Sequence, residues 1–167
     1  MAKLNEWKPD DWEGKNLKKK EYKSYDEYVE HQKDGIKSKG EHVIFGRFGR
    51  DVDRFKNNFK LLDFLKDKNC LCLGARSGAE VKALIDLGNK AIGIDLEPGT
   101  KNEYVQKGDF HNLQFKDQEF DVVYTNAFDH VFDLDKALQE ISRVLKDDGY
   151  FILEIVAGYE EGGWPGS

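Results

Sequence analysis

Two hydrophobic periods alternate along most of the chain. Short, nearly continuous apolar runs, typical of strands buried on both faces, occur at residues 69–73, 90–95, 104–107, 120–125 and 150–156. Apolar residues recur at three- and four-residue steps over 51–66, 78–87 and 133–145, which predicts amphipathic helices, the first capped by Asp51. The alternation of strand and helix predicts an α/β fold with a doubly wound, mostly parallel sheet of about five strands.

The first 50 residues are expected to form an extension to this sheet domain. Residues 1–21 show no clear period, and a short helix follows, with Ser24 and Glu27 spaced as a capping box and an end by Gly35. We therefore expect an N-terminal arm and helix at 1–50 and the α/β domain at 51–167.

Charge and cysteine usage exclude several classes of function. The chain has 26 Lys and Arg against 32 Asp and Glu, a net charge of −6, which disfavours a protein that follows a nucleic-acid backbone. Cys70 and Cys72 would point to one side of a strand, too close for an ordinary disulfide, and are expected to be buried. Four scattered histidines predict no metal site. With no apolar run near ~20 residues, we expect no membrane contact and a cytoplasmic location.

A glycine turn joins the first predicted strand to a helix. Gly74 and Gly78 lie at the two ends of this turn, and glycine permits a tight bend that brings a ligand close to a helix N-terminus. Asp95 ends the second predicted strand, where an acid holds ribose hydroxyls in doubly wound nucleoside sites. The glycines alone are equally consistent with a purely structural turn. Together with the acid they predict a nucleoside cofactor.

Arg76 lies inside this turn and limits which nucleoside cofactors could bind there. A dinucleotide site uses Gly-x-Gly-x-x-Gly because a pyrophosphate packs against the turn, and Arg76 stands where the second glycine would fall. An arginine there would crowd a pyrophosphate but could pair with a single carboxylate. The pattern therefore disfavours a nicotinamide-dependent oxidoreductase, although such an enzyme would share the acid at Asp95.

The order of these segments resembles the class I S-adenosylmethionine-dependent methyltransferases over about residues 50–157. Besides the glycine turn and Asp95, the resemblance is carried by Gly108-Asp109-Phe110, by the segment 120–126 and by the segment 143–150. It implies a Rossmann-like fold, S-adenosylmethionine as cofactor and methyl transfer to an acceptor that these motifs do not name. The family's sheet normally continues with two more strands, so the chain resembles a C-terminally shortened member.

The resemblance implies a cofactor site in two parts. In the first part, Gly74, Ala75 and Gly78 would line the methionine and ribose, and Asp95 would hold the ribose hydroxyls.

The second part would hold the adenine and the sulfonium. Asp109 would accept from the adenine amino group while the Phe110 backbone N–H meets the ring, and Thr125 and Asn126 would border the reacting sulfonium.

Two positions depart from the family pattern at the methionine end. Cys72 stands where the family has an acid, and Arg76 stands where it has a glycine. Arg76 could hold the cofactor carboxylate directly, or it could face solvent.

Asp129 and His130 directly follow the fourth predicted strand, where a doubly wound sheet opens its crevice. His130 could be the base that takes a proton from an acceptor hydroxyl or amine. The alternative is a histidine held in a loop by Asp129 or Asp133. A cofactor-binding or assembly protein without catalysis is the alternative for the whole chain.

We expect a small-molecule substrate. We also consider a homodimer, because the fifth predicted strand is apolar on both faces and would be an open edge without further strands. The N-terminal arm is the other candidate for covering that edge.

Overall fold

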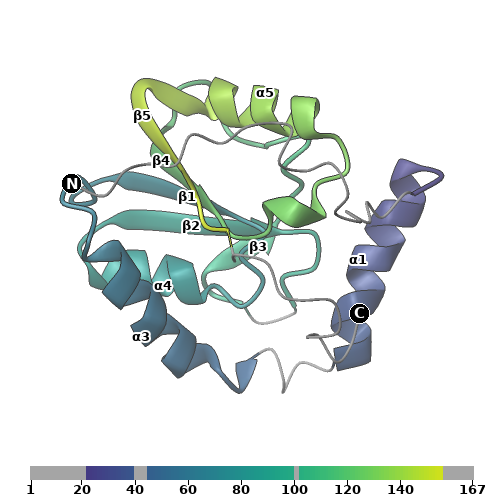
Figure 1. Ribbon diagram of the computed structural model, residues 1–167, viewed down its shortest axis with the longest axis horizontal. Helices are drawn as coiled ribbons and strands as arrows, with labels where there is room; N and C mark the ends of the chain where they lie inside the picture. Colours follow the sequence, from purple (N-terminus) through teal and green to yellow (C-terminus); the bar gives the residue numbers. More distant parts are fainter. Residues whose placement is uncertain (1–21, 40–44, 100–101, 156–167) are drawn as a thin grey trace, which may run out of the picture.

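Five parallel strands form one sheet in the computed structural model, which describes residues 22–39, 45–99 and 102–155 (Figure 1). The strands are β1 (Asn69–Leu73), β2 (Lys90–Asp95), β3 (Val105–Lys107), β4 (Phe120–Thr125) and β5 (Leu145–Leu153). Their order across the sheet is β3-β2-β1-β4-β5, and all four pairings are parallel. The predicted α/β fold with a parallel sheet of five strands is confirmed.

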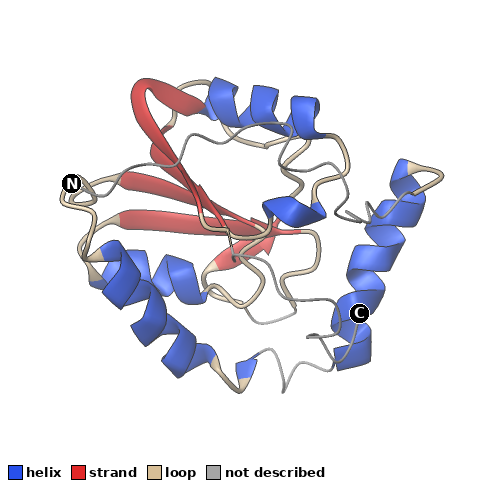
Figure 2. Cartoon of the chain, in the orientation of Figure 1, coloured by secondary structure: helices blue, strands red, loops and turns tan. Residues whose placement is uncertain are grey.

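Helices α3 (Phe48–Phe59) and α4 (Ala79–Asp86) cover one face of the sheet, and α5 (Leu134–Val144) covers the other (Figure 2). Helix α1 (Tyr25–Lys39) and the 3-10 turn η2 (Phe128–His130) lie at the carboxyl ends of the strands (Figure 1). Cys70 and Cys72 of β1 pack in the core beneath α3 and α4, whereas Leu71 and Leu73 pack in the core beneath α5. Successive side chains of a strand point to opposite faces of the sheet, so this alternation is expected for a strand that is buried on both faces. The prediction that both cysteines are buried is confirmed, and both are free thiols.

The helix predicted over 51–66 is correct in type and wrong at both ends. It begins at Phe48, with Arg47 as an N-cap that makes no side-chain bond, so Asp51 lies in the first turn and does not cap it. It ends at Phe59, after which Leu62 N–H donates to the Phe59 carbonyl in a tighter turn. Leu62 still packs on the core from that turn, so the apolar period continues past the helix.

Helix α1 begins as its capping box predicts and ends later than expected. Glu27 N–H donates to Ser24 Oγ at 3.2 Å, the forward bond of the box. The helix continues through Gly35 to Lys39, so the predicted end was wrong. A glycine inside a helix costs only about 1 kcal/mol relative to alanine and need not end it.

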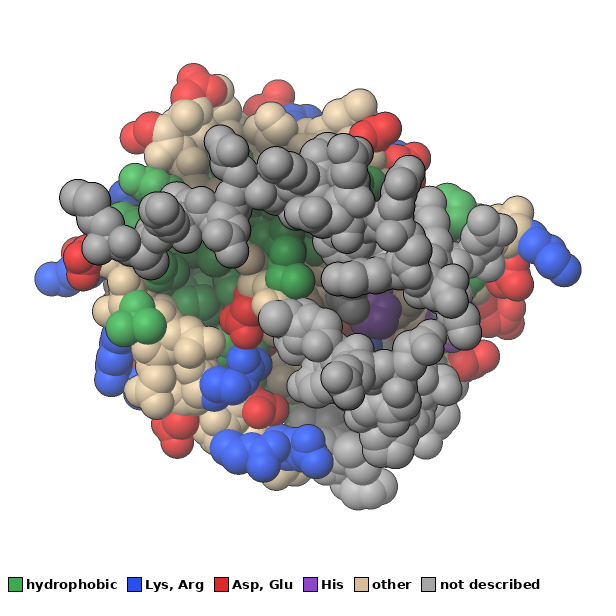
Figure 3. Space-filling model, viewed as in Figure 1, with side chains coloured by type: hydrophobic (Ala, Val, Ile, Leu, Met, Phe, Trp, Pro, Cys, Tyr) green, Lys and Arg blue, Asp and Glu red, His purple; other side chains and the backbone are tan. Residues whose placement is uncertain are grey.

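Strand β5 also differs from its prediction, because it begins at Leu145 and not at Tyr150. Leu145 pairs with Phe120, and a register shift precedes the Val122–Tyr150 pair, so an irregular segment opens the strand. Its described end is Leu153, with Ile155 beyond it 75% exposed. Figure 3 shows apolar side chains gathered over this edge of the sheet.

The open edge leaves two sequence predictions standing. Within the described residues β5 pairs with β4 alone, and Tyr150 and Leu153 are exposed. The homodimer stays a prediction, and the arm at residues 1–21 lies outside the described residues. No described helix is long and apolar enough to cross a bilayer.

Candidate functional site

The turn between β1 and α4 needs glycine at both of its ends. Gly74 has φ +68° and Gly78 has φ +80°, left-handed backbone that side chains rarely adopt. A Cβ on Gly74 would lie 2.7 Å from the Ala127 Cβ, and one on Gly78 would lie 2.7 Å from the Tyr104 Cβ. The two glycines therefore let the turn lie against the loops that follow β2 and β4.

Replacing Gly78 by alanine should lower the free energy of unfolding by more than the matched change Gly88→Ala. Both positions have positive φ, but a Cβ on Gly88 (φ +89°) meets nothing within 4 Å. The extra loss at Gly78 should be roughly 1–3 kcal/mol, the usual cost of forcing an additional carbon into a packed region. Urea unfolding of the two variants measures it, and equal losses would show that the Tyr104 contact is unimportant.

Asp95 organises the turn from the end of β2. The side chain is 9% exposed. Its Oδ2 accepts from Arg76 N–H at 3.0 Å, and its Oδ1 accepts from Glu97 N–H at 2.9 Å. Arg76 has φ +35°, a strained conformation for a residue with a side chain, and the bond to Asp95 helps to hold it. Each carboxylate oxygen keeps a further lone pair, so Asp95 can still accept from ligand hydroxyls.

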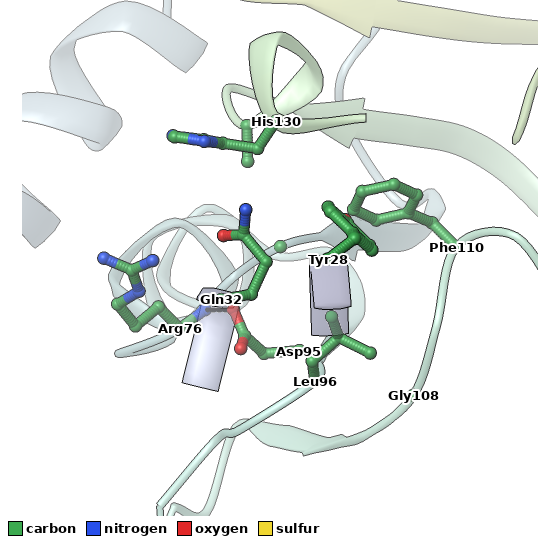
Figure 4. Close-up of a pocket in the computed structure, with 10 residues that line it drawn as sticks. Tyr28, Gln32, Arg76, Asp95, Leu96, Gly108, Phe110 and His130 are labelled. Carbon is green, nitrogen blue, oxygen red and sulfur yellow. Dashed lines mark hydrogen bonds between the residues drawn. The ribbon is translucent and has the colours of Figure 1, made fainter. Parts of the chain in front are cut away.

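A small pocket lies at the carboxyl ends of the central strands, with a cavity of about 40 Å³ (Figure 4). Five predicted site residues line it: Gly74, Arg76, Asp95, Phe110 and His130. The other residues that line it are Tyr28, Gln32, Leu96, Gly108 and Ala127. The structure thus brings the glycine turn, the acid of β2 and the histidine after β4 to one place.

The remaining predicted residues lie around this pocket and not in its wall. Ala75 is buried, and its N–H donates to the Ile94 carbonyl. Thr125 is buried as well, with Oγ1 donating to the Leu73 carbonyl and accepting from Ala127 N–H.

Two other predicted site residues, Gly78 and Asn126, are also absent from the wall of the pocket. Asn126 is exposed, and Gly78 forms the N-cap of α4. The side chain of Asp129 lies outside the described part of the chain. Their predicted roles, like those of Ala75 and Thr125, stay predictions.

Asp109 precedes Phe110 of the pocket wall and is held by hydrogen bonds from His111. Its Oδ1 accepts from His111 N–H at 2.8 Å and from His111 Nδ1 at 2.9 Å. His111 is 2% exposed, and its Nε2 accepts from Asp133 N–H, which places the ring proton on Nδ1. Burial raises the pKa of the Asp109 carboxyl, but the hydrogen bonds from His111 and the charge of Lys136 outweigh it and hold that pKa below its usual range.

Two features of the site were missed by sequence reasoning. Tyr28 and Gln32 reach the pocket from α1, and burial raises the pKa of Tyr28 to about 12. Tyr22, Tyr25 and Tyr28 recur at three-residue steps in the sequence, but nothing in the sequence indicated the surface against which they pack. Glu80, in the first turn of α4, is only 4% exposed, and burial raises its pKa to about 8. In the described ranges, no group of three acidic, histidine or cysteine side chains is arranged to hold a metal ion.

The chain is similar in sequence and in fold to known methyltransferases. The profile of the family described as "Methyltransferase domain" matches residues 71–153, from β1 to the end of β5. The uncharacterized methyltransferase YcgJ of Bacillus subtilis is 33% identical over 97 residues, which cover 50% of this chain and 38% of that protein. Its crystal structure aligns with a TM-score of 0.50 at 26% identity, covering 63% of this chain and 50% of that one.

Two further matches extend the comparison. Malonyl-[acyl-carrier protein] O-methyltransferase 1 of Coxiella burnetii is 34% identical over 104 residues, 57% of this chain and 36% of that protein. A putative S-adenosyl-L-methionine-dependent methyltransferase of Methanococcus maripaludis shares the fold, with a TM-score of 0.56 at 18% identity over 83% of this chain and 68% of that one. The chain spans less than half the length of the curated relatives that it matches.

Proposed function

We propose that this chain, which belongs to the class I S-adenosylmethionine-dependent methyltransferases, binds S-adenosylmethionine at the carboxyl ends of β1 and β2 and transfers its methyl group to a small molecule. The observation that carries the proposal is the position of Asp95. Its carboxylate lines the pocket beside the glycine turn and is held by two backbone N–H groups. This is the arrangement that orients a carboxylate toward ribose hydroxyls in doubly wound folds.

The side chains of the pocket fit the chemistry of this cofactor. Asp95 offers acceptors for the ribose, Phe110 and Leu96 offer apolar walls for the adenine, and the Arg76 guanidinium offers donors for a carboxylate. When bound, S-adenosylmethionine supplies a methyl carbon already activated by its sulfonium. The work left to the protein is largely positioning.

Arg76 is the residue that we assign to the carboxylate of the methionine end. Its backbone is fixed at positive φ by the bond to Asp95, and its side chain lines the same pocket. A guanidinium can pair with a carboxylate through two parallel hydrogen bonds. This assignment would compensate for Cys72, which stands where the family has an acid and is fully buried.

His130 is the residue that we assign as the base. It lies in η2 directly after β4, it is exposed, and it lines the pocket on the side opposite Asp95 in Figure 4. A neutral imidazole there can take the proton that an acceptor hydroxyl or amine loses as it is methylated. Asp129 precedes it and is proposed to orient it.

Ligand binding tests the proposal directly. We expect S-adenosylmethionine and S-adenosylhomocysteine to raise the melting temperature of the whole chain, and NAD to leave it unchanged. Stabilisation by NAD alone would contradict the cofactor assignment. Binding of both sulfur ligands without methyl transfer to any of a panel of acceptors would favour a cofactor-binding protein without catalysis.

Replacing Asp109 by asparagine should lower the preference of the site for adenine. The carboxylate accepts from an exocyclic amino group, whereas an amide can turn a donor toward the base. We expect the ratio of affinities for S-adenosylhomocysteine and S-inosylhomocysteine to fall by roughly three- to tenfold, about the value of one hydrogen bond. Calorimetry with the two ligands measures the ratio. An unchanged ratio would remove Asp109 from the adenine site.

The acceptor and the cellular location stay predictions. The Coxiella relative is named for methyl transfer to a malonyl group on a carrier protein, and a relative from Caenorhabditis elegans is named a sterol 4-C-methyltransferase. We propose a small-molecule acceptor and a cytoplasmic location.

A further inference from the structure

Helix α1 lies across the carboxyl ends of the central strands, over the proposed cofactor site (Figure 1). Two of its side chains, Tyr28 and Gln32, line the pocket with Arg76 and Asp95 (Figure 4). Tyr28 is 1% exposed, so the helix is seated in the site and not beside it.

The same helix occupies the hydrogen-bonding position of the adenine. The hydroxyl of Tyr25 donates to Asp109 Oδ2, while His111 takes Oδ1 of the same carboxylate. An adenine amino group is also a donor, so it would meet Tyr25 at the oxygen left open by His111. Tyr25 takes one of the two acceptor sites of Oδ2, so Tyr25 and the adenine would crowd the same oxygen of Asp109.

The space in the pocket leads to the same conclusion. Its cavity is about 40 Å³, whereas pockets that bury ligands of drug size enclose roughly 300–1,000 Å³. An adenosine with its methionine end is larger than this cavity, so its complete burial here requires Tyr28 and Gln32 to move. The residues suit the ligand, and the enclosed volume does not.

The contacts that hold α1 on the rest of the described chain can be broken without unfolding the sheet. These contacts are made by side chains, with no backbone hydrogen bond to the sheet among the described residues. Tyr25 and Tyr28 pack their rings on His111 and Phe132, with ring centroids 5.5–5.8 Å apart. Breaking these ring contacts and the hydroxyl bond of Tyr25 costs less than unfolding the sheet.

We propose that α1 is a displaceable cover, and that the adenine amino group replaces the Tyr25 hydroxyl on Asp109 when the cofactor binds. This inference rests on the proposed function, because it needs a nucleoside ligand in the pocket. The apparent affinity for the cofactor equals the affinity of the open state multiplied by the fraction of molecules that are open. Tyr25 is thus a residue that sets how readily the cofactor enters.

Tyr25→Phe tests the cover, with Tyr22→Phe as the matched control. The first variant keeps the ring on Phe132 and His111 and loses the bond to Asp109. The second loses a hydroxyl whose hydrogen-bond partners, His31 and Gln32, both lie in α1 itself. We expect Tyr25→Phe to bind S-adenosylhomocysteine roughly three- to tenfold more tightly than wild type, and Tyr22→Phe to match wild type. Calorimetry supplies the affinities.

Hydrogen exchange gives a second readout that does not depend on activity. Amides of α1 should exchange faster in Tyr25→Phe than in Tyr22→Phe without ligand, and S-adenosylhomocysteine should speed their exchange in wild type. Equal or weaker binding by Tyr25→Phe, or slower exchange of α1 with ligand, would overturn the cover and leave the proposed function standing. Absence of binding by wild type and by Tyr25→Phe alike, with both folded, would overturn both.

Discussion

Replacing Asp95 by alanine is expected to weaken the binding of S-adenosylmethionine by roughly ten- to a hundredfold, about 1.5–3 kcal/mol. The change removes a charged acceptor that lines the pocket at the end of β2. It also releases the N–H groups of Arg76 and Glu97, which the carboxylate now holds. The loss should therefore include both the ribose contact and part of the order of the turn. Isothermal titration calorimetry measures it.

Two further variants separate these contributions. Asp95→Asn keeps the size of the side chain and one acceptor oxygen, so its affinity should lie between wild type and Asp95→Ala. Asp148→Ala removes an exposed acid from the irregular start of β5 and should bind like wild type. If Asp95→Ala is folded and binds the cofactor as tightly as Asp148→Ala does, Asp95 has no place in the site.

Wild type should lose more stability than Glu80→Gln as the pH rises from 5 to 9, by roughly 2–4 kcal/mol. Burial raises the pKa of Glu80 to about 8 in the folded chain, above the ordinary 4.5 of an unfolded one. Between these values the folded state holds a proton that the unfolded state releases, so stability falls as pH rises. Asp95 and Glu154 add to the shift, while the backbone N–H of Glu80 and the charge of Arg54 oppose it.

Comparing how the free energy of unfolding changes with pH in wild type and in Glu80→Gln separates the ionisation of the carboxyl from the effect of the substitution on packing. A glutamine at position 80 changes packing equally at every pH, so only the difference between the two pH profiles reports the carboxyl. Glu103→Gln, at an exposed position, should keep the wild-type slope. Urea unfolding at several pH values supplies the profiles. Parallel profiles for wild type and Glu80→Gln would show that Glu80 ionises normally in the folded protein.

The central sheet could be predicted closely, because its strands are short apolar runs with clear ends. The strands β1, β2 and β4 begin and end where the sequence predicts. The end of α3 could not be placed, because Leu62 and Leu65 continue the helical period while they pack on the core from a turn. A period reports which residues face the core, and a tight turn can satisfy it as well as a helix.

The sequence indicated those residues of the pocket wall that local chemistry determines and missed those that tertiary packing brings there. The glycine turn and Asp95 were predictable, because positive φ and a strand-terminal acid leave a mark in a short stretch of sequence. Tyr28 reaches the pocket from a helix far along the chain, and no local pattern indicates that contact. Glu80 is a polar residue at the start of a helix, which ordinarily lies at the surface, yet here it is buried.

A crystal structure of the chain with S-adenosylhomocysteine would show whether the cofactor occupies the pocket at the ends of β1 and β2. We expect the ribose hydroxyls on the Asp95 carboxylate, the adenine amino group on Asp109, and α1 withdrawn so that Tyr25 no longer contacts that acid. A ligand bound elsewhere on the protein, with the pocket at the ends of β1 and β2 unchanged, would contradict it.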